Sequence, residues 1–171
     1  MTEHRSLSWA QKEAQRDHMK ASERGGEIVG VAAIMLVALF FYAHQAWSTG
    51  FFSSSFGQTE AFFLYGSILI GTVGPLARFV TGRRNVSRPP ELIASIFWIV
   101  GSAWLLISFP FNFAHFGDVL PGFFQFLVSW ITNSIARVLF ALGTLGGLIF
   151  TILNAKLYSQ VRRLLPLQGM H

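Results

Sequence analysis

Five side chains with catalytic or metal-binding chemistry lie in or beside the connections between long apolar segments. They are two imidazoles, two carboxylates and one guanidinium: His44, Glu60, His115, Asp118 and Arg137. Imidazoles and carboxylates are suitable ligands for zinc or another divalent metal, and His115 and Asp118 are spaced to share one helix face. The spacing of the whole set matches no metal motif, so two alternatives stay open. One is a binding cleft without a metal, and the other is a set of solvated residues in which Arg137 pairs with Glu60 or Asp118.

No catalytic or cofactor motif accompanies these residues. The chain has no cysteine, which excludes disulfides and thiolate metal sites. Ser-His-Asp, paired-carboxylate and phosphate-loop patterns are absent as well. A haem or chlorin held by His44 and His115 would need a histidine well inside an apolar segment, but His44 lies at the end of one and His115 lies in a connection. We therefore expect no cofactor and no metal, and the sequence argues more against an enzyme than for one.

The elements that must position the five residues are four apolar segments. Hydrophobic residues make up 52% of the chain and charged residues only 12%, whereas a soluble domain is roughly 25% charged. The predicted membrane spans cover residues 28–47, 61–80, 92–109 and 138–155, and each is long enough for the hydrocarbon core of a bilayer. The predicted fold class is an all-α integral membrane four-helix bundle.

Polar segments flank this membrane domain, which covers residues 28–165. Residues 1–27 carry five basic and five acidic side chains and are predicted to be partly helical, with that helix ending near Gly25-Gly26. Residues 166–171 form a short tail.

The region before the fourth span has a helical pattern too long for one crossing. Residues 121–165 would form a helix of roughly 67 Å, more than twice the thickness of the hydrocarbon core. Either one long helix projects from the membrane, or a break near Asn133 separates an interfacial amphipathic helix over 121–136 from the span. The break is favoured because the aromatic residues between 123 and 130 would otherwise face water. Asn133 or Ser134 is then expected to cap the span.

Three further features of the segments lead to specific expectations. Phe51, Phe52 and Phe56 in the first connection are expected to dip into the lipid headgroups. Pro75 is expected to kink the second span, and the pair Pro89-Pro90 to stop any helix before the third.

Basic residues lie asymmetrically about the spans. The N-terminal segment has five, the loop after the second span has Arg78, Arg83, Arg84 and Arg88, and the residues after the last span include three, Lys156, Arg162 and Arg163. Arg137 is alone on the other side, so the positive-inside rule predicts cytoplasmic N- and C-termini. Topology alone explains these loop arginines, although anionic lipid headgroups are possible partners. Nucleic acid is excluded as a partner, because the basic residues flank apolar runs rather than covering a groove-facing surface.

Small residues recur at four-residue spacing on two spans. Ser67 and Gly71 lie on the second span, and Gly143, Gly147 and Thr151 lie on the last. Such ladders let helices approach closely, either between copies of a chain or within one bundle.

Because the span interiors carry no ionisable group, a proton relay or voltage sensor is disfavoured. The leading hypothesis is a plasma-membrane protein acting by assembly, as a homo-oligomer or as a small subunit of a complex. The alternatives are a channel or passive transporter for a small solute, and a membrane enzyme with an outer polar site.

Overall fold

The computed structural model describes residues 17–168, with side chains described as far as Ser159, and this part contains helices and no strand. The α-helices are α2 (Ala21–Ala46), α3 (Gln58–Ile70), α4 (Val73–Thr81), α5 (Arg88–Ser108) and α6 (Asn133–Gln168). Short 3₁₀ helices are η1 (Asn85–Ser87), η2 (Phe113–His115) and η3 (Gly122–Leu127). Four helical segments, with α3 and α4 forming one of them, are long and apolar enough to cross a membrane. The predicted all-α, multi-pass fold is confirmed.

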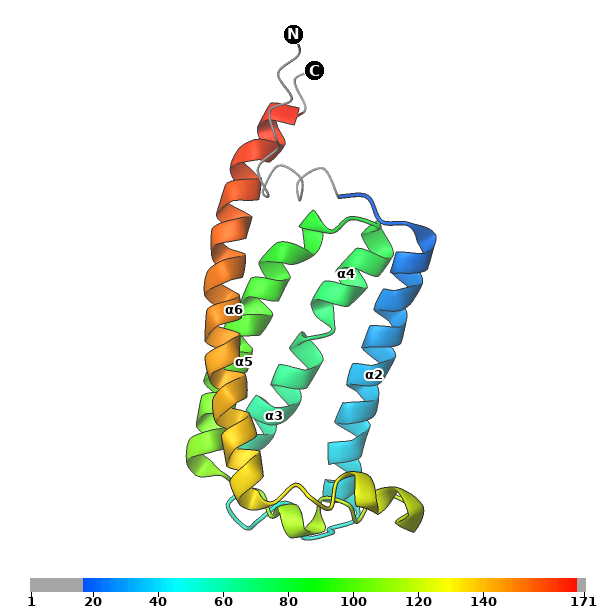
Figure 1. Ribbon diagram of the computed structural model, residues 1–171, viewed down its shortest axis with the longest axis vertical. Helices are drawn as coiled ribbons and strands as arrows, with labels where there is room; N and C mark the ends of the chain where they lie inside the picture. Colours follow the sequence, from blue (N-terminus) through cyan, green and yellow to red (C-terminus); the bar gives the residue numbers. More distant parts are fainter. Residues whose placement is uncertain (1–16, 169–171) are drawn as a thin grey trace.

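The helices run side by side as elongated columns (Figure 1). One end of the bundle, which we call the charged end, holds the start of α2, the end of α4 and the start of α5. The opposite end, which we call the aromatic end, holds the connections before α3 and before α6. Helix α5 packs on α3 and α6, whereas α2 packs on α3 and α4.

Helix α2 starts earlier than the predicted first span. It begins at Ala21 and continues through Gly25 and Gly26, where the sequence predicted the end of a separate polar helix. The expected helix end is therefore wrong, because the first polar turns belong to the spanning helix itself. They carry Glu23 and Glu27 into the charged end. The remainder of the predicted N-terminal helix lies outside the described residues.

The second span is interrupted one turn before Pro75. Helix α3 ends at Ile70, and α4 begins at Val73 after a turn at Gly71 and Thr72. Pro75 thus lies in the first turn of α4, where a missing backbone N–H costs no helical hydrogen bond. The predicted irregularity is present as a break one turn before Pro75, at Gly71, whose carbonyl the amide of residue 75 would bind in a continuous helix.

The prolines before the third span also have a different role from the one expected. Pro89 and Pro90 form the first turn of α5 rather than stopping a helix. A proline suits this position because its fixed φ matches the helix and its missing donor would be unpaired there anyway. The helix ends where Phe109 adopts a left-handed φ of 35°, immediately before Pro110.

The fourth span has the break near Asn133 that the sequence favoured. The preceding segment differs from the expected helix over 121–136, since it contains only the six-residue η3 followed by turns. The expected cap is also wrong: the Thr132 hydroxyl accepts the Ile135 amide at 3.3 Å. The Asn133 side chain instead accepts the amide of Phe113 at 2.7 Å, which fastens the start of α6 to the α5–α6 connection.

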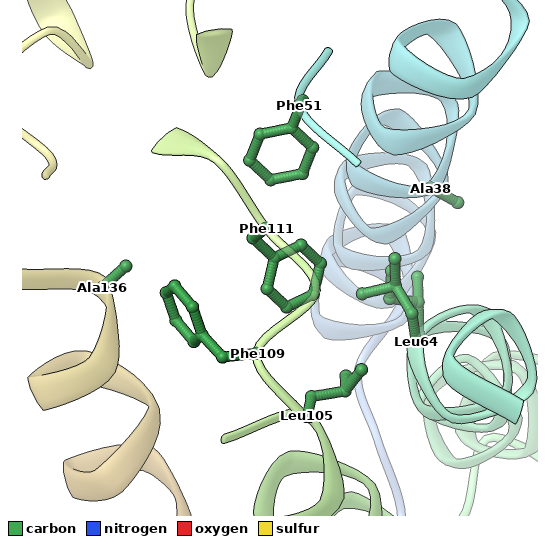
Figure 2. Packing of buried hydrophobic residues seen from close by; sticks show 8 residues of the cluster. Ala38, Phe51, Leu64, Leu105, Phe109, Phe111 and Ala136 are labelled. Carbon is green, nitrogen blue, oxygen red and sulfur yellow. The ribbon is translucent and has the colours of Figure 1, made fainter. Parts of the chain in front are cut away.

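The core of the molecule is concentrated at the aromatic end. Phe51 is fully buried and packs in a cluster with Phe111, Phe109 and Leu105, which Figure 2 shows between the helices. Phe52 and Phe56 lie partly buried beside Phe111. The expectation that Phe51, Phe52 and Phe56 enter the headgroup region is therefore wrong for Phe51. The connections bury their own aromatic residues because those from α2–α3 and α5–α6 meet there.

Candidate functional site

His44 in the last turn of α2 is buried in the aromatic cluster with both ring nitrogens engaged. Its Nδ1 lies 2.6 Å from the Thr49 hydroxyl, and its Nε2 lies 3.2 Å from the Phe116 carbonyl oxygen. A carbonyl oxygen only accepts, so in the neutral ring Nε2 donates and Nδ1 accepts from Thr49. The ring also contacts Phe51, with centroids 4.6 Å apart. His44 therefore has a structural role that leaves no nitrogen for a metal.

His115 and Asp118 form the one local pair that their spacing suggested. The His115 Nδ1 and an Asp118 carboxylate oxygen are 2.8 Å apart, and both side chains are partly exposed. The His115 ring covers Gly50, where an added Cβ would lie 3.2 Å from the ring. Gly50 also has a φ of +89°, which favours glycine. The pair thus lies over the same turn that binds His44.

The remaining two residues of the expected outer cluster have other partners. Glu60 accepts the Gly57 amide at 2.9 Å and the indole N–H of Trp104 at 3.0 Å, so it caps α3 and ties it to α5. The Arg137 guanidinium lies 4.0 Å above the ring centroid of Phe109, a cation–π contact. The expected ion pair of Arg137 with Glu60 or Asp118 is wrong, because both carboxylates bind nearer donors.

The described residues contain no group of three histidine, aspartate or glutamate side chains arranged to hold a metal ion. The structure brings His44, His115 and Asp118 to one turn. Glu60 instead caps α3, and Arg137 of α6 contacts the Phe109 ring. The aromatic end therefore positions these polar groups mainly to hold its own connections together.

A second polar site, absent from the sequence-based set, lies at the charged end. Arg78 of α4 makes a two-point ion pair with Glu27 of α2, at 2.7 and 2.8 Å. The same guanidinium pairs with Glu91 of α5 and donates to the Ser87 hydroxyl at 3.2 Å. Arg78 is only about one-fifth exposed, since its side chain retains 21% of its accessible surface. One side chain thus joins three of the spanning segments.

The other loop arginines differ in what they contact. Arg84 pairs with Glu23 at 2.8 Å, and Arg88 donates to the Asn85 side chain at 2.8 Å. Arg83 is exposed. Since Arg78 and Arg84 are neutralised within the chain, the arginine loop is a weaker candidate for anionic lipid headgroups than its charge suggested.

The signal that sequence reasoning missed is the acidic pair Glu23 and Glu27, one helical turn apart on the same side of the membrane as the arginines.

These charged groups surround a polar cavity of about 410 Å³, which we call the vestibule. Its charged lining residues are Glu23, Glu27, Arg78, Arg84, Arg88 and Glu91. Three positive and three negative side chains balance, so the vestibule has no net formal charge.

Two further cavities lie between the helices beyond the vestibule. One, which we call the groove, has a volume of about 420 Å³ and is lined by α3, α5 and α6. The other, which we call the inner cavity, has a volume of about 130 Å³ and is also lined by α2. They share Ser67 and Trp98, so they adjoin, and the groove shares Glu91 with the vestibule.

The small residues predicted to form packing ladders have different surroundings. Gly147 packs inside the chain, because an added Cβ would lie 3.1 Å from Trp98. Ser67 faces Gly101 of α5, Gly71 lies in the break after α3, and Gly143 has open space around it. The Thr151 hydroxyl donates to the carbonyl of Gly147 at 2.8 Å within α6. Packing within one chain thus accounts for part of the ladder, and Gly143 faces the groove.

Compared with known proteins, the chain matches no family model, no curated protein and no solved structure.

Proposed function

We propose that the protein acts by assembly, as a subunit of a homo-oligomer in the plasma membrane. The observation that carries this proposal is the outer face of α6. No residue in the apolar window of this helix is buried within the chain, and its main packing partner is α5. The other three spans bury more of their windows. Every residue in the apolar window of α6 is therefore at least partly open to lipid or to a second copy.

One stripe of α6 has the spacing of a helix–helix seam. Its members are separated alternately by three and four residues: Leu139, Leu142, Gly146, Ile149 and Leu153. The four apolar side chains are between 49% and 60% exposed, and nothing lies within 4 Å of a Cβ added at Gly146. Apolar residues on this spacing face a partner helix, and a central glycine lets two backbones approach closely. The same stripe on two copies would form a symmetric dimer contact.

Substitution of Gly146 by leucine tests this proposal. We expect the wild-type chain to be dimeric in mild detergent and in lipid bilayers, and Gly146→Leu to weaken dimerisation about tenfold because the added side chain separates the helices. The matched control is Gly30→Leu, which adds the same side chain to open space on α2. Dimer fractions would be measured by single-molecule photobleaching over a range of protein-to-lipid ratios.

A monomeric wild-type chain under both conditions would refute the homo-oligomer. Recovery of the chain only together with a different polypeptide would also refute it and favour a hetero-complex. Equal weakening by Gly146→Leu and Gly30→Leu would exclude the α6 stripe as the contact.

The alternatives have less structural support. Hydroxyls that would line a channel bond within the bundle. Thr72 donates to the Leu69 carbonyl, and the single proton of the Thr144 hydroxyl has the Phe140 carbonyl at 2.8 Å and the Ser102 hydroxyl at 2.9 Å as alternative acceptors. The enzyme alternative would depend on the outer polar residues, and these bind separate structural partners.

We also propose that the charged end is cytoplasmic. In the described part, Arg137 is the one arginine or lysine near the aromatic end, while the others gather toward the charged end. Cytoplasmic loops carry such an excess of basic residues.

Labelling of single introduced thiols tests this orientation, because the natural chain has no cysteine. Ser54→Cys lies in the exposed connection before α3, and Val86→Cys in the exposed loop after α4. We expect a membrane-impermeant maleimide to label Ser54→Cys on intact cells and Val86→Cys only after permeabilisation. The reverse pattern would mean that the orientation is inverted.

A further inference from the structure

The connection between α5 and α6 contains a compact loop over residues 121–131, which we call the aromatic loop. It packs on its own connection, because side-chain atoms of Val128 and Gln125 lie 3.4 and 3.5 Å from a Cβ added at Gly117. The Gln125 side-chain amide also donates to the Leu120 carbonyl at 3.2 Å. None of the described helices packs extensively on η3, which forms the centre of the loop. The aromatic loop therefore has an outer surface that the bundle does not cover.

This outer surface is apolar and uncharged. Five large apolar side chains of the loop are between 45% and 70% exposed: Phe123, Phe124, Phe126, Leu127 and Trp130. No charged residue occurs between Asp118 and Arg137 in the sequence. An exposed apolar patch of this kind marks contact with another protein or with a membrane.

The polar groups of the aromatic loop donate to its own backbone. The Trp130 indole N–H donates to the Leu127 carbonyl at 2.8 Å, and the Ser129 hydroxyl donates to the Phe126 carbonyl at 3.2 Å. Backbone amides between residues 124 and 131 also donate to carbonyl oxygens of the loop. Water would satisfy such donors equally well, whereas a lipid environment requires that they be paired within the chain. The hydrogen bonds therefore suit lipid surroundings.

The aromatic loop lies at the level where the spans end. Phe116, just before it, contacts the last turns of α2, since its carbonyl binds His44 and its ring centroid lies 5.1 Å from that of Phe40. Asn133, just after the loop, begins α6. Figure 1 shows the loop extending sideways past the end of α2, on the opposite side of the aromatic end from α6. This direction places its apolar surface against the bilayer beside the bundle, away from the proposed dimer contact.

We propose that the aromatic loop is an interfacial anchor, whose apolar side chains insert among the lipid headgroups and upper acyl chains on the aromatic side of the membrane. Its partner is the lipid surface irrespective of headgroup charge, because the loop carries no charge that would select a headgroup. The loop achieves this without the amphipathic helix that the sequence predicted, since turns pair its donors instead. The anchor is a role additional to the proposed assembly and does not depend on it.

A fluorescent label at the tip of the aromatic loop tests the proposal. The natural chain has no cysteine, and a Cβ added at Gly122 meets open space, so Gly122→Cys can carry a nitrobenzoxadiazole label while the apolar side chains stay in place. In phosphatidylcholine vesicles with iodide on both sides, we expect phosphatidylcholine spin-labelled near its headgroup to quench this label and iodide not to. Ser54→Cys, exposed in the connection before α3, is the matched control at the same end and should show the reverse. Leu36→Cys, exposed within α2, should respond most to a spin label deep in the acyl chains.

Substitution of Phe126 by serine tests whether the apolar side chains hold the loop in the membrane. In the Gly122→Cys background, Phe126→Ser should lower quenching by the spin-labelled lipid about twofold and raise quenching by iodide about twofold, because anchoring scales with the apolar area inserted. Ile107→Ser is the matched control and should change neither, since it removes an exposed apolar side chain of α5 near the same end.

Three outcomes would overturn the interfacial anchor. Iodide quenching at Gly122→Cys equal to that at Ser54→Cys would mean that the loop lies in water. Protection of the Gly122→Cys label from both quenchers would mean that protein, such as a second copy, covers the loop. Equal effects of Phe126→Ser and Ile107→Ser would mean that the apolar side chains of the loop do not hold it in the membrane.

Discussion

Replacement of Phe51 by alanine should lower the free energy of unfolding by about 3–5 kcal/mol, the usual cost of removing a fully buried phenylalanine. Phe51 has no exposed surface. Its ring centroid lies between 4.6 and 5.9 Å from those of six neighbours: Phe41, His44, Phe52, Phe111, Phe113 and Phe116. These rings belong to α2, its following connection and the connection after α5, so one deletion loosens three segments.

The effect of Phe51→Ala would be measured by denaturant unfolding in detergent micelles with tryptophan fluorescence as the signal. Phe51→Leu fills part of the space and should cost less. Phe123→Ala is the matched control, since Phe123 is 70% exposed and its ring contact is with Phe124. We expect the control to cost under about 1 kcal/mol. A similar loss for Phe51→Ala and Phe123→Ala would mean that the aromatic cluster does not stabilise the fold.

The contrast between Phe51 and Phe123 shows that hydropathy locates the spans but does not determine which phenylalanines of the connections are buried. A run of apolar residues identifies each span, because that signal is local and the length of the run matches the bilayer. Whether a phenylalanine in a connection is buried depends on which other connection packs against it. Phe51 and Phe111 are 60 positions apart in the sequence, yet their chains meet, since the amide of Asn112 donates to the Phe51 carbonyl at 2.7 Å. No local pattern contains that information.

The effect of a proline within one helix also could not be predicted from the local sequence. A proline inside a helix breaks it, whereas a proline in the first turn fits it. Pro75, Pro89 and Pro90 all lie in first turns, so their effect depends on where each helix starts. The turn at Gly71 and Thr72 sets that start for α4, and the sequence-based prediction had assigned those residues to the span interior.

For the candidate site, the sequence could predict a contact between neighbouring residues but not which distant residues come together. The His115 and Asp118 contact follows from their spacing of three residues. Glu60 and Arg137 instead bind Trp104 of α5 and the ring of Phe109, which follows α5, and only the fold brings these partners together. The vestibule was missed because two of its acidic members, Glu27 and Glu23, lie 51 and 61 residues before the arginines that they pair with.

Replacement of Arg78 by alanine should produce the second large loss, about 2–4 kcal/mol in the free energy of unfolding. Removing one partner of a partly buried ion pair leaves its counter-charges without compensation. Here the counter-charges are two, Glu27 and Glu91, whose side chains are 18% and 31% exposed. Because these carboxylates lie on α2 and α5, the variant should also loosen the contacts of both helices with α4.

Two further variants separate the charge of Arg78 from its geometry. Arg78→Lys keeps the positive charge but loses the two-point contact with Glu27, so it should recover only part of the loss. Arg83→Ala is the matched control, since it removes an exposed arginine from the same loop and should change the free energy of unfolding by under about 0.5 kcal/mol.

A double-mutant cycle then isolates the Arg78–Glu27 interaction. Glu27→Gln should destabilise the wild-type chain, but it should cost much less in the Arg78→Ala background, where Glu27 has already lost its partner. Additive losses in the cycle would mean that the pair contributes no coupling. Any loss caused by Arg78→Ala would then come from its contacts with Glu91 and Ser87.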